Sequence, residues 1–210
     1  MKNGKWIDIS QPVHDNMAHW PEDIPFSYEL SFTKKQTESV NIGRMTTSLH
    51  TGTHVDAPFH FLDNGEKMID LDINHFIGPC LVADVTSLKT ITREALENLH
   101  IYGAERLLLK TLTVSSPNIF PKSVPCLTVD AVDFLKESDI KLLGVDVPSV
   151  DPLDSKELLI HHQLYKHQIN ILENVKLDHI KPGKYELAAL PLPLEEGDGS
   201  PVRAAIRVPD

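Results

Sequence analysis

The sequence has little cysteine and fewer basic than acidic residues. Two cysteines, Cys80 and Cys126, among 210 residues exclude a disulfide-rich scaffold and a sulfur-rich structural metal site, and we expect both to be free, buried thiols. Lysine and arginine number 20 against 30 acidic residues, so the net charge is −10. This charge disfavours nucleic acids and anionic membrane surfaces as partners.

Long hydrophobic runs are missing as well. No stretch approaches the roughly 20 apolar residues that a membrane-spanning helix needs, and residues 1–6 lack the apolar core of a signal peptide. We therefore expect a cytoplasmic protein. With 41% hydrophobic and 24% charged residues, the chain has the composition and length of one globular domain, which we expect to span residues 1–210.

Metal-ligand side chains gather in one segment, residues 50–61, which contains three of the eleven histidines and one aspartate. His50, His54, Asp56 and His60 all have even numbers, so in a β-strand they would share one face. A fully extended strand would place His50 and His54 roughly 13 Å apart, too far to share an ion. We therefore expect the chain to bend at Gly52, because glycine adopts positive φ readily.

These donors indicate a particular kind of metal site. Imidazole and carboxylate ligands without cysteine favour zinc or a similar divalent ion in a site that keeps positions open for water. Any one of these histidines alone would more often be an ordinary surface or core residue. Their concentration around a glycine and a proline favours the metal site.

The middle of the chain is typical of an α/β fold. Apolar runs at 81–85, 106–109 and 141–145 alternate with helix-like segments at 92–100 and 128–137, which predicts parallel strands joined by helices. Asp146 follows the last run and either caps the next turn or orients a metal-bound histidine. Residues 111–125 are rich in serine and proline and are interpreted as a loop without an assigned role.

Two further candidate ligands lie in the second half of the chain. Residues 155–167 have helical spacing and residues 168–175 resemble a strand, so His161 and Glu173 fall on different elements. On a single helix they would be about 18 Å apart. A helix that turns back into a strand can bring them together, and His162 is an alternative to His161.

The sequence resembles a known family at its metal-ligand segment. The pattern His50-x-Gly-Thr-His-x-Asp-x-Pro-x-His-Phe61 is similar to the signature of the cyclase family of metal-dependent hydrolases. Four other segments match the family pattern: residues 6–12, 144–152, 171–174 and 198–204. The resemblance implies one α/β domain with a mixed sheet, of the swivelling β/β/α type, and a homodimer.

The resemblance also implies a set of site residues. Two divalent ions, Zn²⁺ first and Mn²⁺ or Co²⁺ as alternatives, would be bound by two ligand sets that share Asp56. The first set is His50, His54 and Asp56; the second is Asp56, His161 and Glu173. His60 would act as general acid and base, and Trp20 would contact the substrate. Related proteins tend to have glycine where this chain has Glu22, close to Trp20.

Within the family the chain most resembles the bacterial formamidases. This implies hydrolysis of the small molecule N-formyl-L-kynurenine to L-kynurenine and formate, a step of tryptophan degradation, by attack of a metal-activated water. Two other hypotheses remain. One is a related hydrolase that acts on a different cyclic or acyclic amide, which Trp20 and its loop would distinguish. The other is a non-catalytic metal-binding module.

Overall fold

The computed structural model describes residues 4–209, so the segment 1–6, in which no signal peptide is expected, lies partly outside the described residues. The centre of the protein is a nine-stranded mixed sheet in the order β1-β13-β11-β5-β7-β9-β10-β4-β12. The strands of this sheet are β1 (Ile7–Asp8), β4 (His54–Asp56), β5 (Ile77–Asp84), β7 (Arg106–Lys110), β9 (Leu142–Val145), β10 (Asn170–Glu173), β11 (Gly183–Ala188), β12 (Gly199–Pro201) and β13 (Ala205–Arg207). The predicted α/β fold with a mixed sheet is confirmed.

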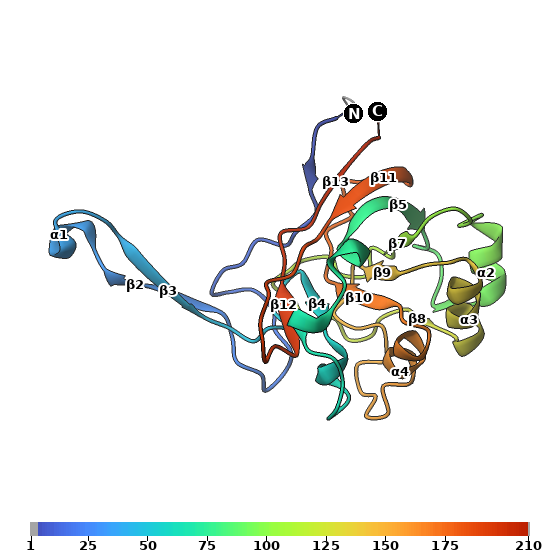
Figure 1. Ribbon diagram of the computed structural model, residues 1–210, viewed down its shortest axis with the longest axis horizontal. Coiled ribbons are helices and arrows are strands. Elements are labelled where there is room, and N and C mark those ends of the chain that lie inside the picture. Colours follow the sequence, from blue (N-terminus) through green and yellow to red (C-terminus); the bar gives the residue numbers. More distant parts are fainter. Residues whose placement is uncertain (1–3, 210) are drawn as a thin grey trace.

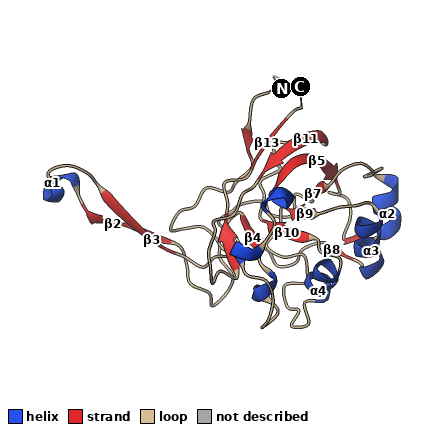
Figure 2. Cartoon of the chain, viewed as in Figure 1, coloured by secondary structure: helices blue, strands red, loops and turns tan. Residues whose placement is uncertain are grey.

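The middle of the sheet is parallel, as the alternating pattern predicts. Strands β5, β7, β9 and β10 run parallel to one another, and the flanking strands β11 and β4 pair antiparallel with β5 and β10. Helices α2 (Arg93–Asn98), α3 (Val129–Glu137) and α4 (Leu159–Lys166) lie together on one face (Figure 1, Figure 2). The minor elements are α1 (Lys34–Thr37), the strand pair β6 (Thr90–Ile91) and β8 (Cys126–Leu127), and the 3₁₀ turns η1 (Pro58–His60), η2 (Met68–Asp70) and η3 (Ile73–Phe76).

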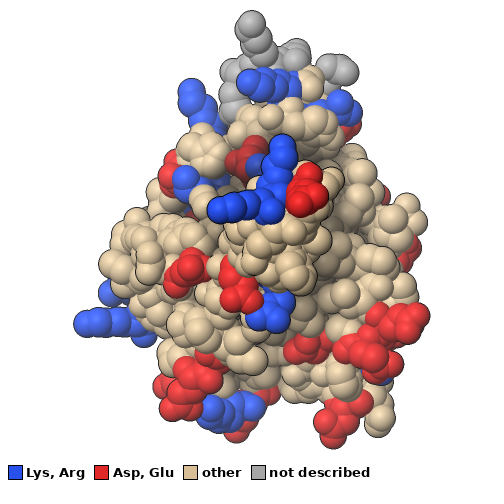
Figure 3. Space-filling view, turned by 90° about the vertical axis from the view of Figure 1, so that its left-hand side faces the viewer, with Lys and Arg blue, Asp and Glu red and all other residues tan. Residues whose placement is uncertain are grey.

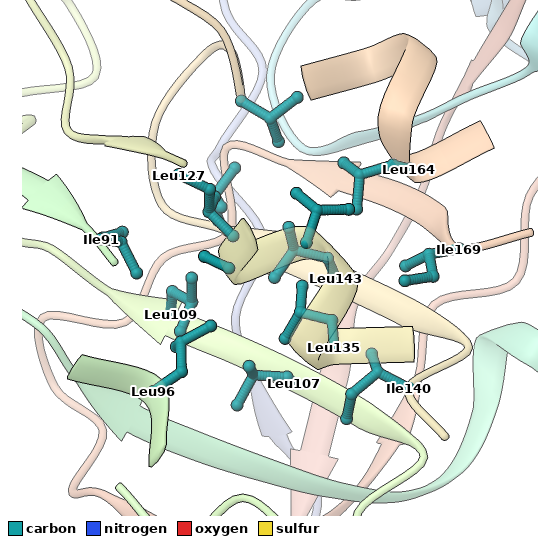
Figure 4. Close-up of a cluster of buried hydrophobic side chains, with 14 of the residues drawn as sticks. Ile91, Leu96, Leu107, Leu109, Leu127, Leu135, Ile140, Leu143, Leu164 and Ile169 are labelled. Atoms are coloured by element: carbon teal, nitrogen blue, oxygen red, sulfur yellow. The ribbon is translucent and has the colours of Figure 1, made fainter. Parts of the chain in front are cut away.

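Two apolar clusters cover the two faces of the sheet. The first lies under the helices and joins Leu107 and Leu143 of the central strands to Leu96, Leu135 and Leu164 of the three helices (Figure 4). The second lies on the other face and includes Phe76 and Tyr185. Both sides of the central strands are therefore buried, which explains why their sequences are continuous apolar runs.

Threonines occupy the N-cap positions of α2 and α3, and only one of them caps its helix. The Thr92 hydroxyl accepts a hydrogen bond from the Ala95 amide and caps α2. Thr128 lies at the N-cap position of α3, but its hydroxyl donates to the Ile91 carbonyl at 3.5 Å and accepts no hydrogen bond from a helix amide. Both cysteines are free, as predicted, although Cys126 is only half-buried.

The sequence also predicts strands at 28–33 and 43–50, the second leading into the metal-ligand segment, and in the structure these strands form a separate hairpin. Strand β2 (Ser27–Phe32) pairs antiparallel with β3 (Ile42–Thr46), and together they project from the body as an arm (Figure 1). The prediction that the second strand continues to His50 is wrong, because β3 ends at Thr46 and His50 lies in a turn. No helix among residues 4–209 is long and apolar enough to cross a membrane.

Candidate metal centre

Strand β4 carries two of the predicted ligands at the centre of the site. His54 and Asp56 are two residues apart on this strand, so both side chains point to one face, and they are 1% and 4% exposed. The chain bends before the strand at Gly52, whose φ of +68° confirms the predicted turn. The prediction that His50, His54, Asp56 and His60 share one face of a single strand therefore holds only for His54 and Asp56. His50 lies in the turn before β4, and His60 lies in η1 after it.

Asp56 lies between two groups of donors. Its Oδ1 atom is 2.9 Å from His50 Nδ1 and 3.2 Å from His54 Nε2. Its Oδ2 atom is 3.6 Å from His161 Nε2. One carboxylate oxygen of Asp56 thus faces each group.

Glu173 completes the second group from the neighbouring strand. Strands β10 and β4 are antiparallel, and Glu173 pairs directly with His54. Its Oε2 atom is 3.6 Å from His54 Nε2 and its Oε1 atom is 3.8 Å from His161 Nε2. Oε1 also accepts a hydrogen bond from the Val150 amide, which fixes the carboxylate. The structure brings His161 and Glu173 together through a helix that leads into a strand.

The two neighbouring histidines of α4 have different surroundings. His161 is buried, and its Nδ1 atom is 2.7 Å from Asp151 Oδ2, which leaves Nε2 facing Asp56 and Glu173. His162 packs its ring against Phe61, with centroids 5.4 Å apart, and belongs to none of the donor groups found among residues 4–209. The geometry therefore favours His161.

Asp151 was missed by sequence reasoning. Its carboxylate accepts hydrogen bonds from the Ile160 and His161 amides, so it caps α4 and also orients the His161 ring. A carboxylate behind a metal-binding histidine is the usual arrangement in metal sites. The only sequence signal was its place in the family-like segment 144–152.

Asp146 has neither of its two predicted roles, because its carboxylate binds a segment that comes earlier in the chain and not the next turn or a site histidine. Its carboxylate accepts hydrogen bonds from the amides of Thr111 and Leu112 and from the Thr111 hydroxyl, the last at 2.6 Å. Burial raises the pKa of this carboxyl group. Asp146 therefore holds the start of the 111–125 segment, and Asp151 takes the histidine-orienting position.

The donor geometry fits divalent metal ions. Two ligands of one tetrahedral zinc lie about 3.3 Å apart, and the nitrogen–oxygen distances around Asp56 and Glu173 run from 2.9 to 3.8 Å. Burial and the nearby Asp56 charge raise the pKa of Glu173 well above its usual value. Positive charge stabilises two buried carboxylates this close, and bound divalent cations would supply it when the histidines are neutral.

A cavity of about 370 Å³ opens beside these donors. The residues that line it include four of the predicted ligands and the predicted acid–base group: His50, His54, His161, Glu173 and His60. Burial and the His50 charge lower the pKa of His60. The cavity is large enough for a small organic molecule, so the donors can act on a bound ligand.

The wall of the cavity is aromatic. Trp20 and Phe120 meet edge to face, with ring centroids 5.2 Å apart, and both line the cavity. Phe120 belongs to the 111–125 segment, which therefore has a role that the sequence did not reveal. The turn after Trp20 is made by Glu22 in the left-handed region, at φ 72°, where glycine is the usual residue.

Comparison with known proteins places this site in a family. The family model described as "Putative cyclase" matches residues 7–152, which include the whole 50–61 segment. The chain belongs to the cyclase family. One relative, the kynurenine formamidase of Bacillus mycoides, is 57% identical to this chain over 207 residues, which are 99% of each chain. That of Bacillus anthracis is 56% identical over the same length and the same share of each chain.

Solved structures share the cyclase-family fold. A protein described as a potential metal-dependent hydrolase with cyclase activity has a TM-score of 0.83 and 25% identity, over 98% of this chain and 99% of that one. Isatin hydrolase A from Labrenzia aggregata, bound to benzyl benzoate, has a TM-score of 0.81 and 23% identity, over 98% of this chain and 94% of that one. Together with the donor groups, the first of these supports a metal cofactor for the cyclase-family chain.

Without metal, His50 and His161 are protonated at neutral pH, because the pKa of each is raised. Burial lowers the pKa of His50, but hydrogen bonds to Asp198 and Asp56 outweigh it and raise the value to about 10. Burial likewise lowers the pKa of His161, and Asp151 and Asp56 raise it to about 10. Metal ions must displace these protons, because imidazole coordinates in its neutral form.

Metal binding is therefore expected to release at least about two protons at pH 7.5, one from each histidine. Affinity should rise with pH up to about 10, where His50 and His161 lose their protons without metal. Isothermal titration of zinc into metal-free protein, in two buffers with different ionisation enthalpies, measures the release. Equal heats in the two buffers would contradict the prediction.

Proposed function

We propose that this chain hydrolyses N-formyl-L-kynurenine to L-kynurenine and formate, a step of tryptophan degradation. The observation that carries the proposal is the 57% identity to a kynurenine formamidase over 99% of both chains. The donor groups beside an aromatic cavity support it, because an amide hydrolase needs both.

Two divalent ions, most consistently zinc, are proposed for the two donor groups, with Mn²⁺ and Co²⁺ as alternatives. His50, His54 and Asp56 would hold one ion, and Asp56, His161 and Glu173 the other. When bound, the ions would polarise the formyl carbonyl and lower the pKa of a water molecule, which supplies the nucleophile. Asp151 and the Val150 amide keep His161 and Glu173 oriented toward this position.

His60 is proposed as the acid and base of the reaction. It lines the cavity beside His50, with ring centroids 3.9 Å apart, and its side chain is 35% exposed. The departing aryl amine needs a proton, and a histidine whose pKa lies near or below neutrality exchanges protons readily. The lowered pKa of His60, caused by burial and by His50, makes it neutral and able to accept a proton first.

The aromatic wall supports an aromatic substrate. Trp20, which is 39% exposed, lines the cavity together with Phe120, and such aromatic rings suit stacking on the aryl ring of formylkynurenine. Asp23 and Lys156 also line the cavity and offer opposite charges for the ammonium and carboxylate groups of an amino acid.

Release of L-kynurenine from N-formyl-L-kynurenine by purified protein, followed by near-ultraviolet absorbance, tests the proposal. We expect rapid release that a chelator abolishes and zinc restores. Isatin, a cyclic amide, is assayed in parallel because isatin hydrolases share the fold. Turnover of isatin without turnover of formylkynurenine would replace the proposed substrate with that of a related hydrolase, and binding of zinc without any turnover would favour a metal-binding module.

We also propose a homodimer, supported by the projecting arm. Tyr28 pairs with Met45, and Leu30 lies two residues further along the same face, so three large apolar side chains, 46–60% exposed, share one side of the hairpin. Glu29 and Arg44 form an ion pair on the other side. An isolated two-stranded hairpin is marginally stable in water, so a second copy of the chain covering the apolar side would stabilise it. The cytoplasmic location stays a prediction.

Replacing Leu30 and Met45 by glutamate is expected to weaken the dimer at least about 100-fold, because each buried side chain contributes about 1.5 kcal/mol or more. Sedimentation velocity over a range of concentrations measures the change. The control is Arg44→Gln on the polar side, which should leave the dimer intact. A wild-type monomer at high concentration would contradict the proposal.

Charges of both signs are scattered over the side of the molecule from which the arm projects (Figure 3).

A further inference from the structure

Asp198 approaches the metal centre from the far end of the sequence. It directly precedes β12, which pairs antiparallel with β4 so that Gly199 lies opposite Asp56. The Ala57 amide donates a hydrogen bond to the Asp198 carbonyl at 2.9 Å. The backbone of Asp198 is therefore held in register with the strand that carries His54 and Asp56.

One oxygen of the Asp198 carboxylate faces two histidines of the site. Oδ2 is 3.0 Å from His50 Nε2 and 3.5 Å from His60 Nδ1. The two rings lie over one another, with centroids 3.9 Å apart and planes inclined by 31°. His50 is thus held between Asp198 at Nε2 and Asp56 at Nδ1, the nitrogen that faces the metal donors.

Nδ1 is the His60 nitrogen that faces the Asp198 carboxylate, at ion-pair distance. When Nδ1 faces Asp198, Nε2 is the nitrogen left for the cavity that His60 lines. Asp198 is not among the residues that line this cavity. Asp198 would therefore act on a ligand in this cavity through the two histidine rings that it contacts.

The approach depends on glycine at the next position. A Cβ atom on Gly199 would lie 2.8 Å from His50 Cε1, closer than such atoms pack. With glycine there, the His50 ring can sit against β12 and reach the Asp198 carboxylate. The Asp198-Gly199 pair thus explains why residues 198–204, which match the family pattern, lie next to the site.

We propose that Asp198 is a positioning residue that orients the ligand His50 and the acid–base group His60 through a single carboxylate oxygen. The proposal rests on the proposed function as a metal-dependent hydrolase. Carboxylates that accept the second N–H of a metal-binding histidine fix its ring, and their loss typically costs 10–100-fold in metal affinity or activity. Here the same carboxylate would align ligand and proton donor together.

Asp198→Asn removes the charge and keeps the shape. We expect a fall of about 10–100-fold in kcat with a small change in KM, and a similar loss of zinc affinity in competition with a chromophoric chelator. Long-range ¹H–¹⁵N spectra should show changed tautomer populations at His50 and His60. The matched control is Glu195→Gln, an exposed carboxylate of the same loop, which should leave all three readouts unchanged.

Asp198→Glu keeps the charge and displaces the oxygen by about one methylene. We expect kcat of this variant to fall with KM unchanged. If Asp198→Asn does not fold, Asp198→Glu tests the proposal by itself. Zinc affinity and histidine spectra equal to wild type in both variants would overturn the proposal. So would three zinc ions bound per wild-type chain, since His50, His60 and Asp198 would then hold an ion themselves. Zinc affinity and spectra do not depend on the substrate, so absence of kynurenine release would refute the proposed function alone.

Discussion

Replacing Asp56 by asparagine is expected to remove the bound metal and to lower kcat/KM by about 10³-fold or more. Each carboxylate oxygen faces a different donor group, so one substitution affects both groups. An amide nitrogen in place of one oxygen presents hydrogen-bond donors to the ion, and the side chain is only 4% exposed, so water does not compensate. A catalytic metal supplies several kcal/mol of transition-state stabilisation, and each 1.36 kcal/mol is a factor of ten.

Metal content by mass spectrometry and kcat/KM for N-formyl-L-kynurenine measure the effect of the Asp56 substitution. The matched control is Asp63→Asn, an exposed aspartate in the turn after the metal segment, which should keep metal and turnover. An Asp56→Asn protein with full metal content and wild-type turnover would show that Asp56 is not a shared ligand. Loss of the ions with retained turnover would remove the metal from the reaction.

Replacing His60 by alanine is expected to lower kcat about 10²- to 10⁴-fold while the metal content stays unchanged. His60 lies on η1 beyond the strand that carries His54 and Asp56, and it is outside the two donor groups that share Asp56. Its loss therefore removes proton transfer to the aryl amine without removing a ligand of those groups. Turnover of the metal-loaded variant and its metal content distinguish the two effects.

The control for the His60 substitution is His162→Ala. His162 is a half-buried histidine against Phe61, outside the donor groups of residues 4–209, so its loss should leave kcat close to that of wild type. Full turnover in His60→Ala would assign proton transfer to another group. A large loss in His162→Ala together with loss of metal would reverse the choice between His161 and His162.

The local predictions were confirmed where the signal lay within a few residues. The turn at Gly52, the parallel central strands and the helices at 93–98 and 129–137 follow from backbone preference and from the spacing of apolar residues. The same reasoning placed His161 and Glu173 on a helix and a following strand. Such patterns depend on near neighbours, and the tertiary structure preserved them.

The wrong or incomplete predictions concern segments whose role depends on distant partners. Residues 43–50 were predicted as one strand into the site, but β3 ends at Thr46 because, among residues 4–209, it pairs only with β2 in the arm. Residues 111–125 had no predicted role, and their importance arises from Phe120 meeting Trp20 across about 100 residues of sequence. Neither the pairing of β3 with β2 nor the contact of Phe120 with Trp20 can be predicted from the spacing of apolar residues in its own segment.

The sequence by itself determined which side chains this protein has for chemistry: imidazoles and carboxylates without cysteine, clustered at residues 50–61 beside a glycine that bends the chain. Only the tertiary structure decided which carboxylates serve which histidine. Asp151 reaches His161 because α4 folds over it, and Asp198 reaches His50 because β12 pairs with β4. The physical reason is that sheet pairing joins residues 148 positions apart, while sequence patterns report only on neighbours.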